Sequence, residues 1–376
     1  MPTALKEKQD GLRFLLEPLS RMYAFLMWAR RALYTAELLP RWTPPCPTVS
    51  VGNIGWGGSG KTPLAGWLLA WAAQRTVSAV LLTRGYRAKP LRYPHLVTAE
   101  SLPEEAGDEP LLLARENPQA RVLVDPSRRR AGELAARKFK PEMIVLDDGF
   151  QHLAVKRDVD LVLLTPQDLH AGWNRVIPAG TWREPEGALT AAGAFLIKAA
   201  PDEFKALRKL ADQRLVVFER PVFSFSLAPL GLKRVNREER AGDFESKPYL
   251  LVSGVGDPEQ VERTARSYLG YGPKRHLAYP DHHFFTKEDA LEIEGLAAQV
   301  RCPYVLCTPK DAVKLGELAG DSFWTLDVQV EFGPTLYSAE PFPAWWELRW
   351  QGLRAHYRRL REEAEAKAAA QGGKKG

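Results

Sequence analysis

Residues 48–62 read TVSVGNIGWGGSGKT, and this stretch decides the fold class. It opens with a short β-branched run, and its second half, residues 55–62, matches the phosphate-binding pattern G-x-x-x-x-G-K-[ST]. Apolar residues at helical spacing follow over 64–71. Because strand, glycine-rich loop and helix come in the order that this motif requires, we expect a P-loop within an α/β fold.

The residues of this loop are expected to bind the phosphates of a nucleotide. Glycines let backbone N–H groups turn toward phosphate oxygens, and the helix N-terminus adds a favourable dipole. Lys61 is expected to contact the β- and γ-phosphates and to act in catalysis, and Thr62 is expected to bind a magnesium ion. The predicted nucleotide-binding residues are Gly55, Trp56, Gly57, Gly58, Ser59, Gly60, Lys61 and Thr62.

A second acidic element lies downstream of the loop. Residues 144–149 read IVLDDG, so a hydrophobic strand ends in Asp147 and Asp148. Adjacent carboxylates repel one another unless a cation lies between them, and carboxylates at this place in a P-loop protein hold Mg²⁺. Asp147, Asp148 and Thr62 are therefore the predicted metal site. The guanine-selecting pattern N-K-x-D is absent, since residues 308–311 read TPKD, and this favours ATP as the nucleotide.

Strand and helix patterns alternate over residues 41–214, which predicts a parallel sheet covered by helices on both faces. The predicted strands after the P-loop lie at 77–83, 121–124, 143–146, 160–164 and 193–198. Residues 215–248 have an extended pattern with turns and are expected to form a linker. A second, smaller α/β unit is predicted over 249–345, and residues 346–376 are expected to form a helix and a disordered tail.

The N-terminal segment, residues 1–40, contains one strongly apolar helical pattern. Leucines recur at helical spacing over 15–33, three aromatic residues lie among them, and Arg21, Arg30 and Arg31 flank the apolar stretch. Such a composition is typical of an amphipathic helix in a membrane interface. A helix packed on the core of the protein accounts for the same pattern equally well.

The composition excludes several classes of protein. With 45% apolar and 26% charged residues among 376, the chain is neither wholly disordered nor collagen-like, and its three cysteines exclude a disulfide scaffold. The net charge of +6 is compatible with a partner that carries phosphates or anionic lipid. The sequence has no apolar run long enough to span a membrane and no signal-peptide pattern, so we expect a cytoplasmic protein. It has no basic stripe with interleaved aromatics, so a nucleic-acid partner is not expected.

Further polar residues follow the predicted strands or occupy loops, and each allows a structural interpretation too. Arg84 could be a surface charge, Asp108 a helix cap and His282 a loop residue. Asp281 precedes His282, and a carboxylate can orient an imidazole. The candidate residues outside the P-loop and the acidic pair are Arg84, Asp108, Arg128, Gln151, His152, Asn174, Arg183 and His282.

Taken together, the motifs resemble those of tetraacyldisaccharide 4′-kinases, over roughly residues 12–316. The matching stretches are VGNIGWGGSGKTP, LLTRGYRAK, AGDEPLLLA, VDPSRRRA, IVLDDGFQHLAVKRDVD, NRVIPAGTWREP, YPDHHFFT and CTPKDAVKL. The resemblance implies two α/β/α units, the first like a P-loop NTPase, joined by a β-ribbon linker. It also implies an N-terminal helix that attaches a peripheral enzyme to the cytoplasmic face of the inner membrane. We expect the protein to be a monomer.

The activity implied is transfer of the γ-phosphoryl group of ATP to the 4′-hydroxyl of an acylated glucosamine disaccharide 1-phosphate, a step of lipid A biosynthesis. Asp108 resembles the general base of the family, and His282 its partner from the second unit. By the same resemblance, Arg84, Arg128 and Arg183 are expected to bind phosphate, and Gln151, His152 and Asn174 to contact the acceptor. The alternative hypothesis is a membrane-associated P-loop ATPase that acts as a switch without a lipid acceptor.

Overall fold

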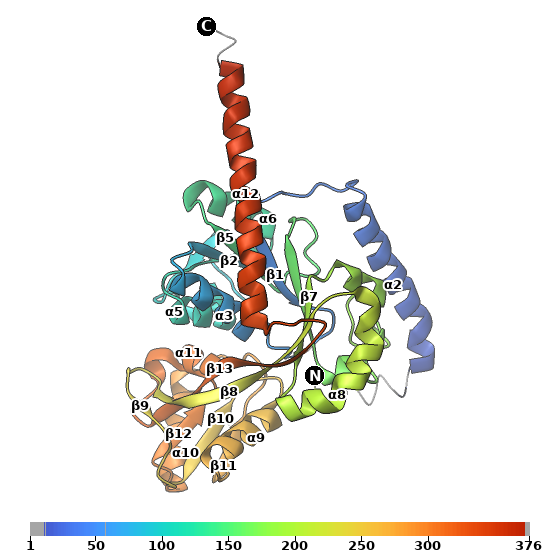
Figure 1. Cartoon of the computed structure of the whole chain (residues 1–376). Coiled ribbons are helices and arrows are strands. Elements are labelled where there is room, and N and C mark those ends of the chain that lie inside the picture. Colours follow the sequence, from blue (N-terminus) through green and yellow to red (C-terminus); the bar gives the residue numbers. More distant parts are fainter. Residues whose placement is uncertain (1–10, 12, 57, 373–376) are drawn as a thin grey trace.

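One mixed sheet runs through the whole molecule (Figure 1). The computed structural model describes residues 11, 13–56 and 58–372. The strand order is β11-β10-β12-β13-β8-β7-β6-β1-β5-β2-β4-β3, and β9 pairs with β8 outside this path. The strands are β1 (Thr48–Asn53), β2 (Ala79–Thr83), β3 (His95–Val97), β4 (Arg121–Val124), β5 (Met143–Asp147), β6 (Val159–Leu164), β7 (Ala194–Lys198), β8 (Val222–Arg234), β9 (Arg240–Ala241), β10 (Tyr249–Ser253), β11 (Arg275–Ala278), β12 (Tyr304–Cys307) and β13 (Phe323–Leu336).

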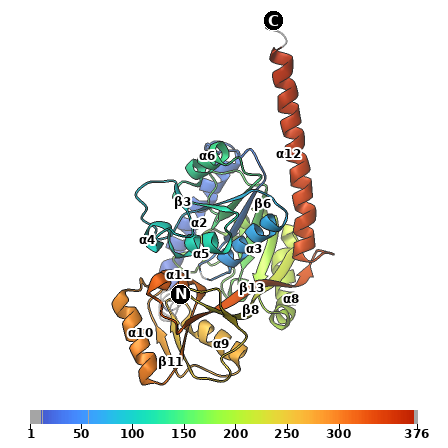
Figure 2. The same cartoon turned by 90° about the vertical axis from the view of Figure 1, so that its left-hand side faces the viewer.

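Helices cover both faces of this sheet (Figures 1 and 2). They are α2 (Arg13–Thr35), α3 (Lys61–Gln74), α4 (Pro103–Ala106), α5 (Asp108–Glu116), α6 (Arg128–Lys138), α7 (Pro166–Leu169), α8 (Pro201–Leu215), α9 (Pro258–Leu269), α10 (Lys287–Gln299), α11 (Pro309–Leu315) and α12 (Phe342–Gly372). Short 3₁₀ turns lie at Glu186–Ala191, Val216–Phe218 and Gly316–Leu318.

The first half of the sheet carries the P-loop. Its central strands β6, β1, β5 and β2 are parallel, and every residue of these strands is buried. Strands buried on both faces need nearly continuous apolar runs, which is why they could be recognised in the sequence. Helix α3 packs its apolar side, including Leu64, Leu68 and Trp71, into the largest hydrophobic cluster of this half.

A long antiparallel ribbon of β8 and β13 joins the two halves. At one end, residues 222–225 of β8 pair in parallel with β7, and at the other end residues 323–325 of β13 pair in parallel with β12. The predicted β-ribbon connection is thus confirmed. The extended pattern expected from residue 215 is wrong at its start, because α8 continues to Leu215 and a 3₁₀ turn follows. The buried residues Phe204, Leu207, Ala211 and Leu215 keep helical spacing up to that point.

The second half is a smaller parallel unit of β11, β10 and β12 with helices α9, α10 and α11. Figure 2 shows it below the P-loop half, with α11 next to α5. Within α11, Asp311 and Lys314 form an ion pair of 2.7 Å, and both side chains are almost completely buried. Asp311 also accepts hydrogen bonds from the Gly254 N–H and the Thr308 hydroxyl. The pair thereby ties α11 to the end of β10.

Replacing Asp311 by alanine is expected to destabilise the protein by about 3–5 kcal/mol, because it leaves the Lys314 ammonium buried without its counter-charge. The double substitution of Asp311 by alanine and Lys314 by methionine should recover much of this loss. Urea unfolding followed by circular dichroism measures both. If Asp311→Ala lowers the free energy of unfolding by less than about 1 kcal/mol, the buried ion pair does not have this stabilising role.

Helices α2 and α12 lie at the outside of the P-loop half (Figure 1). The first part of α12 is anchored by Trp346 and Trp350, whose rings both contact Trp71 edge-on, while its second part extends away from the body. Residues 373–376 of the predicted tail lie outside the described residues. Among the described residues, none of the helices combines the length and apolar character needed to cross a bilayer.

Candidate active site

The P-loop lies between β1 and α3, as its sequence predicts. Gly60 has φ of 86°, and a Cβ there would come within 2.9 Å of the Phe225 ring, so both conformation and space require glycine. Among the described residues, no side chain caps the N-terminus of α3. Its first N–H groups and its dipole therefore favour an anion such as a phosphate.

The other loop residues are held by neighbouring segments. The Trp56 N–H donates to the Thr181 carbonyl, and the Gly58 carbonyl accepts a hydrogen bond from Lys198 Nζ at 3.1 Å. Ser59 is buried, and Gly55 forms a β-bridge with Trp182. The predicted binding residue Gly57 lies outside the described residues.

Lys61 and the acidic pair lie together, as predicted. Lys61 Nζ donates to Asn53 Oδ1 at 2.9 Å and lies 3.5 Å from Asp148 Oδ1. Burial raises the pKa of Asp148, but Lys61 and Arg183 outweigh this effect and hold the pKa below its ordinary value. Asp148 has φ of 48°, a conformation that aspartate tolerates better than most residues.

The neighbouring carboxyl, Asp147, is completely buried. Burial, together with the nearby charges of Glu109 and Asp148, raises its pKa to about 6, against the opposing effects of Lys61 and the Thr83 hydrogen bond. Its Oδ2 accepts a hydrogen bond from the Thr83 hydroxyl, whereas its Oδ1 has no partner among the described residues. An orphaned carboxylate oxygen in a cluster of like charges fits the requirements of a divalent cation, and oxygen ligands suit Mg²⁺.

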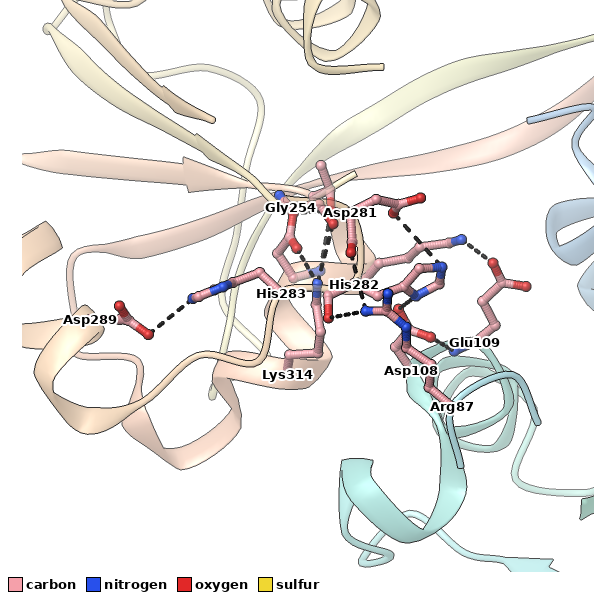
Figure 3. Close-up of polar contacts among 12 residues, drawn as sticks. Arg87, Asp108, Glu109, Gly254, Asp281, His282, His283, Asp289 and Lys314 are labelled. Atoms are coloured by element: carbon pink, nitrogen blue, oxygen red, sulfur yellow. Dashed lines mark hydrogen bonds and ion pairs between the residues drawn. The ribbon is translucent and has the colours of Figure 1, made fainter. Parts of the chain in front are cut away.

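Figure 3 shows the contact between Asp108, the first residue of α5, and His282 of the second half. His282 Nδ1 lies 2.8 Å from Asp108 Oδ2, and Asp281 Oδ1 lies 3.8 Å from Nε2 of the same ring. Burial raises the pKa of Asp108, but the hydrogen bond and charge of His282, with Lys310 and Lys314, lower it below its ordinary value. His282 has φ of 60°, and residues in such sparsely populated conformations cluster at functional sites.

The next residue, Glu109, links this pair to the P-loop. Glu109 Oε2 accepts a hydrogen bond from the Thr62 hydroxyl at 2.7 Å, and Oε1 forms an ion pair with Lys310 of α11. One turn of α5 therefore contacts the P-loop threonine and two residues of the second half. Arg87 adds a further contact across the interface, since it donates to the backbone carbonyls of Asp281 and His282 (Figure 3).

The imidazole of His282 is expected to titrate above its ordinary value of 6.5. Its hydrogen bond to Asp108 raises the pKa, burial lowers it, the charges of Asp108 and Asp281 raise it, and Lys310 lowers it. The contact therefore stabilises the folded protein below about pH 6.5, and this contribution is lost as the pH rises through the raised pKa.

NMR titration of the histidine ring measures this shift. In an Asp108→Asn variant the pKa should fall, because burial and Lys310 remain while the charge of Asp108 is gone. An unchanged pKa would show that the 2.8 Å contact does not govern His282.

His152, which is predicted to contact the acceptor substrate, lies near four guanidinium groups. Burial, together with the charges of Arg128, Arg157, Arg30 and Arg84, lowers its pKa to about 4. The ring is therefore neutral at physiological pH, and its Nε2 is buried without a partner among the described residues. A neutral hydrogen-bonding ring among positive charges suits contact with an acceptor substrate that carries phosphate.

The remaining candidates differ in where the structure places them. Arg183 donates to both carboxylate oxygens of Asp148 and to Gln151 Oε1, so the three lie together. Arg128 is buried and donates to the Asp147 carbonyl, whereas Arg84 is exposed. Asn174 Oδ1 accepts a hydrogen bond from the Glu186 N–H, which supports the 3₁₀ turn and does not join the cluster around Lys61.

Three residues of this site were missed as candidates in the sequence. Glu109 follows Asp108, and Asn53 precedes the P-loop, but neither has a pattern that separates it from a structural residue. Lys310 lies in TPKD, residues 308–311, a stretch that lacks the asparagine of a guanine-recognition motif. Its position in the conspicuous stretch CTPKDAVKL was the available signal.

The geometry of this site is that of a P-loop phosphotransferase in which the two halves of the molecule contribute an aspartate–histidine pair. The family model described as tetraacyldisaccharide-1-P 4′-kinase matches residues 12–339. Tetraacyldisaccharide 4′-kinase of Nitratidesulfovibrio vulgaris is 51% identical over 345 residues, which cover 92% of this chain and 96% of the relative. The Haemophilus influenzae protein of the same name is 30% identical, over 89% of this chain and 94% of the relative.

A solved structure agrees with these relatives. LpxK from Aquifex aeolicus, solved in complex with ATP, matches with a TM-score of 0.67 and 30% identity, over 85% of this chain and 95% of that chain. The chain belongs to the tetraacyldisaccharide 4′-kinase family, whose members are phosphotransferases of lipid A biosynthesis.

Proposed function

We propose that this protein transfers the γ-phosphoryl group of ATP to the 4′-hydroxyl of a tetraacylated glucosamine disaccharide 1-phosphate, forming lipid IV-A. The observation that carries the proposal is the first turn of α5. There Asp108 contacts His282, while the adjacent Glu109 contacts the P-loop residue Thr62. The candidate base is thus adjacent in the chain to a residue that contacts the phosphate-binding loop, and this holds the two close together, as transfer between two bound substrates requires.

The P-loop half binds the nucleotide in this proposal. The N-terminus of α3 and the Lys61 ammonium neutralise the phosphates, and Arg183 stabilises charge on the transferred group. Thr62, Asp147 and Asp148 would hold Mg²⁺, which supplies further charge neutralisation at the phosphates when it is bound. The Thr62 hydroxyl would bind Mg²⁺ through its oxygen while its O–H still donates to Glu109, whose other carboxylate oxygen pairs with Lys310.

Asp108 takes the proton of the acceptor hydroxyl as that oxygen attacks the γ-phosphorus. A carboxylate with a lowered pKa is a weak base by itself. The imidazole of His282 can accept the proton from Asp108, and Asp281 stabilises the resulting imidazolium. The base therefore needs both halves of the molecule. We assign these as a kinase domain that ends with α8 and the 3₁₀ turn at Val216–Phe218, a linker that begins with β8, and a second domain over 249–345.

The test is transfer of label from γ-labelled ATP to tetraacyl disaccharide 1-phosphate in detergent micelles, with a control that lacks the acceptor. Labelled lipid is the expected product. Equal release of inorganic phosphate with and without acceptor, and no labelled lipid, would overturn the proposal and favour an ATPase that acts as a switch.

The acceptor is a lipid, and α2 supplies a surface for its membrane. One face of α2 contacts the body through Ser20, which donates to the Val176 carbonyl, and through Arg31. The other face exposes large apolar side chains, namely Phe14, Leu15, Leu19, Met22, Phe25, Leu26, Trp28 and Leu33. An apolar face with flanking arginines is suited to the interface of an anionic bilayer. We assign the protein as a monomer peripheral to the cytoplasmic face of the inner membrane.

The double substitution of Phe25 and Trp28 by glutamate is expected to weaken binding to vesicles of phosphatidylethanolamine and phosphatidylglycerol about a hundredfold or more, since each buried aromatic contributes roughly 1.5–3 kcal/mol. Vesicle co-sedimentation measures this. Leu291→Glu, which alters an exposed leucine of α10, is the matched control. Equal binding of all three proteins would exclude α2 as the membrane contact.

A further inference from the structure

The loop that follows β2 carries Arg87, which reaches the second half of the molecule beside His282 (Figure 3). Arg87 Nη1 donates to the backbone carbonyls of Asp281 and His282, at 3.4 Å to each oxygen. These two residues lie 194 and 195 positions away along the chain. The guanidinium forms no ion pair among the residues that the structure describes, so no carboxylate there competes with the two carbonyls for its N–H groups.

The backbone of this loop is held by its own half of the molecule. Gly85 has φ of 64°, and a Cβ there would overlap the Val124 side chain, so both conformation and space require glycine. Further along the loop, the Lys89 N–H donates to the Glu104 carbonyl of α4 at 2.7 Å. Arg87 lies between these two fixed points, and its guanidinium therefore extends from a defined position.

The turn that Arg87 contacts has a backbone conformation that needs support. The φ of 60° at His282 lies in the left-handed region, which costs free energy for a residue other than glycine. From the second half, the Gly254 carbonyl accepts a hydrogen bond from the His282 N–H at 3.1 Å. From the P-loop half, one amino group of Arg87 bonds two consecutive carbonyls of the turn. Because the backbone dihedrals of His282 set the direction of its side chain, these contacts also direct the imidazole toward Asp108.

The neighbouring residue Tyr86 contacts both the guanidinium and the imidazole. The guanidinium carbon of Arg87 lies 5.6 Å from the centroid of the Tyr86 ring, within the range of a cation–π interaction. The centroid of the same ring lies 5.2 Å from that of the His282 ring. Residues 86 and 87 thus contact the ring and the backbone of His282, whereas Asp108 bonds to its ring.

We infer that Arg87 is a positioning residue for the candidate base: it holds the backbone of Asp281 and His282 so that the imidazole reaches Asp108. The inference deepens the proposed function, which supplies the reaction that this base serves. Among the described residues, no hydrogen bond joins Arg87 to the P-loop. Loss of its guanidinium should therefore slow the transfer step and leave ATP binding unchanged.

The first test is a double-mutant cycle on the transfer of label to the lipid. Arg87→Ala is expected to lower kcat about five- to tenfold, within the range that one net hydrogen bond contributes, while the KM for ATP changes less than about twofold. Arg87→Lys keeps a cation and a donor and should recover part of the rate. In a His282→Ala protein, whose residual transfer is followed over a longer time, Arg87→Ala should have less than about a twofold further effect, because the imidazole that it positions is gone.

The matched control is Arg92→Ala. It removes an exposed arginine of the same loop that forms no hydrogen bond or ion pair among the described residues, and it should retain full kcat.

NMR titration of the His282 ring measures the same contact without turnover, and the His282→Ala protein identifies the signal. The hydrogen bond to Asp108 raises the pKa of His282, so Arg87→Ala should lower that pKa toward its ordinary value. Loss of the positive charge of Arg87 would by itself raise the pKa. A fall therefore distinguishes lost positioning from lost charge, and Arg92→Ala should leave the pKa unchanged.

The outcomes separate this inference from the proposed function. Absence of transfer by the unchanged protein would overturn the proposed function, while the titration would still report on Arg87. If Arg87→Ala slows transfer equally with and without the His282 imidazole, Arg87 acts on a substrate and the inference is wrong. An Arg87→Ala protein with unchanged kcat, or with a His282 pKa that is unchanged or raised, would overturn it as well.

Discussion

Asp108→Ala lowers kcat for phosphoryl transfer by about 10²–10⁴-fold, the range over which a general base contributes to catalysis. Asp108 is buried, and its carboxylate has the 2.8 Å contact to His282 and a position adjacent to Glu109. Asp108→Asn should lose nearly as much, because the amide keeps the shape and the hydrogen bond to His282 but cannot accept the proton. The measurement is steady-state transfer of label at saturating ATP and acceptor.

Controls separate this loss from damage to the fold. Glu104→Gln changes an exposed acid on the neighbouring helix α4 and should retain full activity. Nucleotide affinity, measured with a fluorescent ATP analogue, should remain within a fewfold in both Asp108 variants. An Asp108→Asn protein with more than a tenth of the original kcat would exclude Asp108 as the base and leave it a structural residue of the interface.

The second large effect is expected for Lys61. Lys61→Ala should lower kcat by about 10²–10³-fold, the loss observed when one preorganised donor to a developing negative charge is removed. Its ammonium is already positioned by Asn53 and Asp148 at the N-terminus of α3. Lys61→Arg should not restore the rate, since a planar fork does not replace a compact ammonium held by these two partners.

Lys205→Ala, which removes an exposed lysine of α8, is the matched control and should leave transfer unchanged. Single-turnover measurements of γ-phosphoryl transfer distinguish a slower chemical step from weaker ATP binding. If Lys61→Ala retains kcat within tenfold and only raises the KM for ATP, then Lys61 serves ground-state binding and its assignment to catalysis is wrong.

The P-loop and the buried strands could be predicted from the sequence, because each depends on residues that are neighbours in the chain. The P-loop is a continuous pattern of glycines, lysine and threonine between a strand and a helix, and each buried parallel strand is a continuous apolar run. The acidic end of β5 is equally local. At residues 215–219 the prediction of an extended segment is wrong, since Leu215 is the last buried position of α8 and a 3₁₀ turn follows it.

Contacts between distant residues could not be read in this way. Asp108 and His282 are 174 residues apart, and Glu109 and Lys310 are 201 apart. The resemblance to a family suggested the first pair, while nothing in the spacing suggested the second. Asn174 is a case in which the sequence predicts a site residue that the structure places elsewhere. Its sequence context matches the site motif, but its side chain supports a 3₁₀ turn.

The amino-acid sequence was therefore sufficient for the class of the protein, its nucleotide loop and its acidic strand end, since hydrophobic periodicity and glycine-rich motifs are properties of short segments. The contact of Asp108 with His282 and the ion pair of Glu109 with Lys310 join the two halves, so they depend on how the β8–β13 ribbon connects these halves. Charge balance at each of these places is set by side chains that meet only after folding, so only the folded chain reveals which charges pair.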